Sequence, residues 1–193
     1  GGEEDGEKTT FTNDAKEYGT ILDISSDDSL TQKFVIRSMD EDTAILGDEA
    51  FMKPVQSEET SIGYYLAKQF SSVHLDFGVR RDEVNRKSLI GSTAYDKDLD
   101  LTSYVMGLCY ELNAMTDFNL SIGSVERAPS SVEMFMNGKH AAINRFEKGN
   151  PNLQSEEAQN IDLSLNFDND GVYGSVNFYQ NDIDNYILSL IHI

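Results

Sequence analysis

The chain has 193 residues, with 34 acidic and 15 basic side chains and a net charge of −19. This charge excludes nucleic acid as a partner, because so acidic a chain cannot neutralise phosphates, and it suits a surface that attracts cations. Only 39% of the residues are hydrophobic, yet 10 Phe and 9 Tyr are too many for a disordered chain, and the single cysteine, Cys109, excludes a disulfide framework.

Eight β-strands are predicted, because apolar residues repeatedly alternate with small or polar ones, as in strands with one apolar face. The alternation is strictest in 73–80, 103–112, 118–123 and 161–168. The only helix-like patch is Ser130–Met136, where Ser-Ser-Val-Glu can cap a short turn. The predicted strands, in chain order, cover residues 16–25, 29–39, 58–70, 73–86, 98–112, 116–126, 157–168 and 171–187.

Short and long connections alternate between these strands. The short ones lie at 25–28, 71–72, 113–115 and 169–171, and the last holds the hairpin signature Asp-Gly. The long ones are predicted at residues 40–57, 87–97 and 127–156. This alternation is typical of an outer-membrane β-barrel, which has short periplasmic turns and long extracellular loops.

Strand length supports the barrel, since crossing a bilayer takes a tilted strand of about 9–11 residues, whereas strands of soluble proteins most often have about 5–6. Tyr104 and Tyr110 lie at the two ends of one apolar face, as in an aromatic girdle. Two alternatives stay open. One is a soluble β-sandwich that acts as a binding module, and the other is a complete eight-stranded outer-membrane barrel with a structural or adhesive role. No nucleophile–base pair, phosphate loop or pair of catalytic carboxylates supports an enzyme.

The long connection 127–156 carries several motifs in order. Arg127-Ala128-Pro129 ends a predicted strand, Glu133-Met134-Phe135 follows, and GNPNLQSE (149–156) leads into the next strand. In this order and context the motifs resemble those of the TonB-dependent outer-membrane receptors. Met134 departs from the Leu that the family has at this position. The resemblance covers residues 10–187.

The resemblance implies part of a barrel of about 22 strands that encloses a plug domain. We therefore expect residues 1–193 to be an all-β, antiparallel transmembrane barrel fragment without plug or TonB box. It should form an open, curved sheet with unpaired edges near 16–25 and 171–187. Outward residues such as Phe77 and Leu163 should be exposed, and residues 188–193 (LSLIHI) are expected to be non-native.

The function that the resemblance implies is uptake of a scarce nutrient across the outer membrane of a Gram-negative bacterium. Its partners would be outer-membrane lipid, a metal or small-molecule ligand, and TonB, which acts through the plug. The stretches 47–54 (GDEAFMKP) and 137–142 (NGKHAA) resemble the zinc-uptake subgroup. The transported ligand is therefore expected to be zinc or another metal species, with no bound cofactor.

Candidate ligands for that metal are His140, Glu133 and Glu147 in the long connection, with Glu49 ranked lower. Imidazole nitrogen and carboxylate oxygen are zinc ligands, although a zinc site normally needs three or four of them. The zinc-uptake subgroup often has His-rich external loops, whereas this connection holds His140 alone. His74 is predicted to face the lumen near a periplasmic turn, where it would touch the plug.

Overall fold

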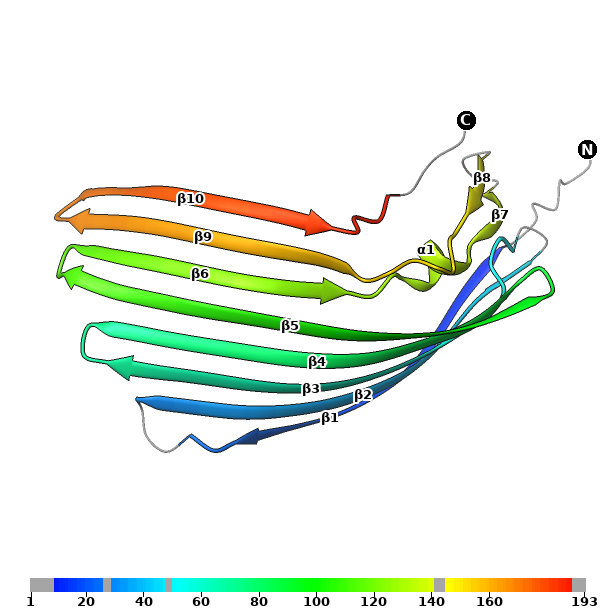
Figure 1. Cartoon of the computed structure of the whole chain (residues 1–193), viewed down its shortest axis with the longest axis horizontal. Helices are drawn as coiled ribbons and strands as arrows, with labels where there is room; N and C mark the ends of the chain where they lie inside the picture. The colour runs from blue at the N-terminus through cyan, green and yellow to red at the C-terminus, as the bar shows by residue number, and fades with distance from the viewer. Residues whose placement is uncertain (1–8, 26–28, 48–49, 141–144, 189–193) are drawn as a thin grey trace, which may run out of the picture.

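The computed structural model describes residues 9–25, 29–47, 50–140 and 145–188. Eight long strands form one antiparallel sheet, and two short strands form a separate ribbon beside a short helix (Figure 1). The elements are β1 (Thr10–Asp23), β2 (Leu30–Leu46), β3 (Val55–Phe70), β4 (Val73–Ile90), β5 (Thr93–Asn113), β6 (Thr116–Arg127), α1 (Ser131–Phe135), β7 (Asn137–His140), β8 (Arg145–Lys148), β9 (Glu156–Asn169) and β10 (Val172–Asp184).

The long strands form a meander, in the order β1-β2-β3-β4-β5-β6-β9-β10. Each strand pairs with its neighbour in this order, and β6 pairs with β9 across the segment that holds α1 and the ribbon. Within the described residues β1 and β10 do not pair with each other, so the sheet is curved and open (Figure 1). This confirms the predicted open antiparallel sheet. A closed eight-stranded barrel and a sandwich of two packed sheets both disagree with it.

One face of the sheet, which we call the outer face, carries apolar side chains in rows that run from strand to strand. The pairing register places Leu66, Phe77, Met106, Ile122 and Ile161 in one such row. Met106 is 54% exposed and Ile161 40%. A continuous apolar surface of this extent is not kept in water, so it is the lipid-facing band of a barrel wall.

The apolar band ends at a common level on neighbouring strands. Ile62 pairs with Arg81, which pairs with Thr102, and one step further out Glu83 pairs with Asp100. From this level on, the outer face is polar and largely acidic. The strands therefore continue beyond the membrane on the side of the predicted external loops.

These extensions correct two of the predicted long connections. Within residues 40–57, β2 continues to Leu46 and β3 begins at Val55, and residues 87–97 form a hairpin that turns at 91–92. Gly91 has φ +61, which a glycine adopts without strain. Alternation does not reveal these extensions, because polar residues lie on both of their faces and the apolar residues on the inner face, such as Ile45 and Val55, are isolated there.

Polar pairs join the strands in this projecting part. Lys87 Nζ lies 3.7 Å from an Asp96 oxygen, and the Asn85 side chain donates hydrogen bonds of 2.7 Å to both Asp96 and Asp98. The third long connection, between β6 and β9, is confirmed. So is the predicted short turn, which is α1. Of the two residues predicted to be exposed, Leu163 is 38% exposed, whereas Phe77 is half-buried by its neighbours on β3 and β5.

Candidate functional site

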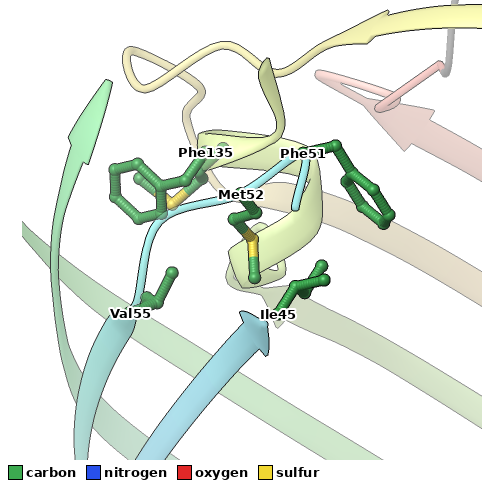
Figure 2. Packing of buried hydrophobic residues seen from close by; sticks show 6 residues of the cluster. Ile45, Phe51, Met52, Val55 and Phe135 are labelled. Carbon is green, nitrogen blue, oxygen red and sulfur yellow. The ribbon is translucent and has the colours of Figure 1, made fainter. Parts of the chain in front are cut away.

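The connection between β6 and β9 folds back onto the inner face of the sheet. Met134 and Phe135 of α1 are fully buried, at 0% exposure, against Ile45 of β2 and Val55 of β3. Figure 2 shows Phe135 and Met52 beside these two strand ends. We call residues 128–155 the docked segment. Its buried apolar side chains form a small hydrophobic core on the inner side of the barrel wall, as in a water-soluble protein.

The helix in this segment forms because its first turn is capped in both directions. The Ser130 hydroxyl accepts a hydrogen bond of 3.2 Å from the Glu133 backbone N–H. The Glu133 carboxylate accepts one of 2.7 Å from the Ser130 backbone N–H. This is a capping box, which satisfies two backbone donors that a short helix otherwise leaves unpaired. The cap fixes the direction in which Met134 and Phe135 point.

A buried arginine anchors the segment to the sheet. The Arg86 side chain is 8% exposed, and its Nε donates a hydrogen bond of 2.9 Å to the Pro129 carbonyl oxygen. Its other nitrogens donate to Ser57 at 2.8 Å and to Glu59 at 3.2 Å. Each of the three guanidinium nitrogens donates a hydrogen bond, which compensates the free-energy cost of burying the charge. The start of the docked segment is therefore held at one position on β3 and β4.

Two glycines allow the segment to approach its neighbours closely. A Cβ on Gly138 would lie 2.8 Å from the Phe51 Cα, and a Cβ on Gly149 would lie 2.6 Å from the Met134 carbonyl. The Asn137 backbone N–H also donates to the Phe51 carbonyl at 2.6 Å. The ribbon of β7 and β8 is therefore packed directly against the loop between β2 and β3.

A polar clasp closes the base of the segment, beyond the apolar band. Arg127 at the end of β6 contacts Glu133 at 3.0 Å and Glu156 at 3.3 Å. Glu156 also accepts a hydrogen bond of 3.0 Å from the Ile187 backbone N–H, which ties in the chain after β10. Arg127, which precedes the segment, thus links the helix within it to the first residue of β9.

The clasp shifts the pKa values of its members. Hydrogen bonds with Glu133 raise the pKa of Arg127, against the effect of burial. Burial alone would raise the pKa of Glu133, but the Ser130 backbone N–H and Arg127 outweigh it, so the pKa is lowered. The Ile187 N–H and Arg127 lower the pKa of Glu156. All three groups are therefore charged at neutral pH.

The structure places the predicted metal ligands in different settings. Glu133 is engaged in the helix cap and in the clasp with Arg127. His140 ends β7 and pairs in register with Arg145, while Glu147 of β8 pairs with Gly138, two positions away along the ribbon. Glu49 lies outside the described residues. Among the side chains that the structure describes, no three His, Cys, Asp or Glu residues gather as a metal site.

The inner face between the docked segment and the short turns is a polar wall with a shallow groove. Gly107 leaves space that the Asp76 carboxylate fills, and Ser121 and Asp162 follow in the same row. His74, predicted to face the lumen, lies one step closer to the short turns, with Nδ1 3.1 Å from the Gln69 amide oxygen. This wall supplies small and polar groups to the interior of a barrel.

The sequence pattern does not single out several of the residues that build the site. Phe51 lies in a stretch predicted as a loop, Arg86 is the last residue of a predicted strand, and the partners of Arg127 are 6 and 29 residues away. One signal was available for Arg86. It follows Asp82 and Val84 at spacing two and so shares the inner face of β4 with an apolar residue.

No helix among the described residues is long and apolar enough to span a membrane. The family described as "TonB dependent receptor-like, beta-barrel" matches residues 8–191. The chain belongs to this family. The resemblance drawn from Arg127-Ala128-Pro129 and GNPNLQSE is thereby confirmed at the level of the family.

Solved structures of two receptors have the same fold. One is a double mutant of the Serratia marcescens hemophore receptor HasR, in complex with its hemophore HasA and heme, with a TM-score of 0.71 over 92% of this chain and 14% identity. The other is the siderophore receptor PirA from Pseudomonas aeruginosa, with a TM-score of 0.59 over 91% and 14% identity. The chain spans only 34% and 40% of these two proteins.

The family fixes the cellular location of this chain. TonB-dependent receptor barrels lie in the outer membrane of Gram-negative bacteria. The apolar band and the strands that project beyond it agree with this location. The zinc-uptake subgroup inferred from residues 47–54 and 137–142 is not distinguished by these comparisons, because both receptors share the fold at low sequence identity.

Proposed function

We propose that this chain is part of an outer-membrane active transporter that imports a scarce, metal-bearing nutrient. The observation that carries the proposal is the docked segment. It lies on the inner face of a membrane wall, at the end where the strands project outward, and it is fixed there by Phe135 and Arg86. A ligand that enters the lumen from outside would therefore pass this segment first.

The rest of the transporter would come from sequence outside this chain. We propose that residues 1–193 are a partial barrel domain, that further strands pair with the open edges at β1 and β10, and that a plug domain fills the lumen. TonB would act on that plug, so transport needs both the plug and the inner-membrane proton gradient. An unpaired strand edge offers a row of hydrogen-bonding groups, which favours pairing with further strands.

Import is tested in cells that carry the full-length protein. Uptake of radioactive iron, supplied as heme or as a siderophore complex, and of radioactive zinc is measured with and without TonB. The proposal predicts accumulation of at least one of these metals that stops when TonB is removed. Equal accumulation with and without the protein would contradict it.

A second candidate concerns the metal itself, because residues 47–54 and 137–142 resemble the zinc-uptake subgroup. We propose His140 and Glu147 of the ribbon as first ligands of zinc, with Glu133 or Glu49 as further ones. Glu133 could take part only by leaving Arg127 and the helix cap. The variant His140→Ala should weaken zinc binding by the full-length protein, whereas His74→Ala, on the inner wall, should not. Unchanged zinc affinity in His140→Ala would remove this candidate.

A further inference from the structure

On the external side, β2 and β4 extend further than the strand that lies between them. The ladder of β2 with β3 ends at Thr43, and the ladder of β4 with β3 ends at Lys87. Residues 44–46 of β2 and 88–90 of β4 still pair with β1 and β5 on their other sides. Among the residues that the structure describes, no strand pairs with these two edges on the side of β3. The sheet therefore has a gap between β2 and β4.

The gap stays open because the chain before β3 turns to the inner face. Pro54 has no backbone N–H with which to continue the ladder, and its carbonyl oxygen accepts a hydrogen bond of 2.9 Å from the Ser88 hydroxyl. Phe51, three residues earlier, is buried in the core beside the docked segment. What remains is a cleft of about 810 Å³, lined by Ala44 of β2 and Leu89 of β4. We call it the strand cleft.

The strand cleft has apolar walls and acidic residues at its end nearest the membrane. Leu89 is 43% exposed and lies beyond the apolar band, where lipid does not cover it. Ala44 and Ala94 line the same walls. Asp14 and Asp42 pair directly in register, and neither forms an ion pair within the described residues. Because like charges directly opposite each other destabilise a strand pair, a cationic group bound here would relieve their repulsion.

We propose that the strand cleft binds an extended peptide with apolar and basic residues, which adds a strand between β2 and β4. Neighbouring strands lie about 4.8 Å apart, so two edges that lack the strand between them leave room for one. The peptide backbone would pair with both edges, its apolar side chains would contact Ala44 and Leu89, and a basic side chain would lie against Asp14 and Asp42. The partner is a protein or peptide outside the cell that presents such a segment. This inference goes beyond the proposed function and does not depend on the imported nutrient.

The chemistry of the strand cleft separates this partner from others. A metal cation alone would use the two carboxylates but would leave the strand edges and Leu89 without a partner. An acidic peptide would be repelled by Asp14 and Asp42. A helix pairs its own backbone groups and is about 10 Å wide, so it would neither fit the gap nor pair with its edges. Only an extended, basic peptide uses the edges, the apolar walls and the carboxylates together.

The test measures binding of the dansyl-labelled peptide Lys-Val-Lys-Val-Lys-Val-Lys to the full-length protein in bilayer nanodiscs of zwitterionic lipid, by fluorescence anisotropy. The double variant Asp14→Asn/Asp42→Asn should bind it about fivefold or more weakly, because two charge contacts are lost. Glu83→Gln/Asp100→Asn is the matched control and should bind normally. These two acids also pair directly in register on the outer face, but they do not line the strand cleft.

A second peptide tests the backbone pairing itself. The same sequence with N-methylated Val residues keeps its charge but loses backbone donors, so it should bind about tenfold or more weakly. Four results would overturn the inference: no binding of the unmethylated peptide, equal binding of the methylated one, unchanged affinity in Asp14→Asn/Asp42→Asn, or an equal loss in the control variant. The last three would mean that the peptide binds by charge alone or at another place.

Discussion

The barrel wall and the docked segment are built for different solvents. In the wall, large apolar side chains point outward and stay exposed, as with Val176 at 73% and Phe178 at 58%. In the docked segment, Met134 and Phe135 are fully buried. The wall is held by backbone ladders and lipid, whereas the segment has a small hydrophobic core of its own. The two regions should therefore be sensitive to different substitutions. The docked segment should respond to the loss of a buried apolar side chain, and the wall to a charge on its outer face.

The largest expected effect is on the docked segment. Phe135→Ala removes a fully buried ring, at an expected cost of about 3–5 kcal/mol for the docking of the segment. The segment should then leave the inner face and be cleaved rapidly by added protease while the barrel remains folded. Val132→Ala, on the same helix but 40% exposed, is the control and should be cleaved at the normal rate. Equal protection of both variants would show that the core does not hold the segment.

The wall should respond to charge on its outer face. Leu163→Arg places a guanidinium in the apolar band, with an expected cost of about 2–4 kcal/mol for barrel stability in a bilayer. Ser164→Arg, on the neighbouring inner position, should cost much less because the lumen is polar. Unfolding in lipid vesicles, followed by heat-modified gel mobility, compares the two. Similar losses in both variants would contradict the assignment of the faces.

A smaller effect is expected from the clasp. Glu133→Gln keeps a side chain that can still cap α1 but removes its ion pair with Arg127, which should cost about 0.5–1 kcal/mol. Protease cleavage of the docked segment should therefore rise only slightly. Glu147→Gln, in the same segment but without an ion pair in the described structure, is the control. A loss as large as that of Phe135→Ala would mean that charge, not burial, holds the segment.

The clasp also predicts a pH dependence. The pKa values of Glu133 and Glu156 are lowered below the ordinary 4.5, so their stabilisation is fully present above pH 4.5 and is lost as the pH falls through the lowered values. Protease protection of the segment should weaken in that acidic range, measured with an acid-active protease. The double variant Glu133→Gln/Glu156→Gln should flatten the profile. An unchanged profile in this variant would exclude the clasp as the cause.

The strands of the wall could be predicted from the sequence because the alternation of apolar and polar residues depends only on neighbouring positions. Alternation such as Ile161-Asp162-Leu163-Ser164 needs only one apolar and one polar face, and it located all eight long strands. It failed where polar residues lie on both faces, so it does not predict the extensions of β2 to β5, whose inner face is covered by a segment distant in the sequence. The docked segment was only partly predictable. Ser130 and Glu133 signal a helix cap locally, but the contact of Arg86 with Pro129 joins residues 43 apart and has no local signal.

The most direct test measures lipid contact along β9 with nitroxide labels at successive positions from 157 to 167, in the full-length protein in bilayers with Cys109→Ser. We expect the labels at 161, 163, 165 and 167 to be highly accessible to oxygen and poorly accessible to a nickel chelate, and the labels between them not to be. The lipid signal should disappear at Gln159 and Glu157, where the outer face becomes polar. Uniform accessibility along the strand, or lipid contact that continues through Glu157, would contradict a wall whose apolar band ends where the docked segment begins.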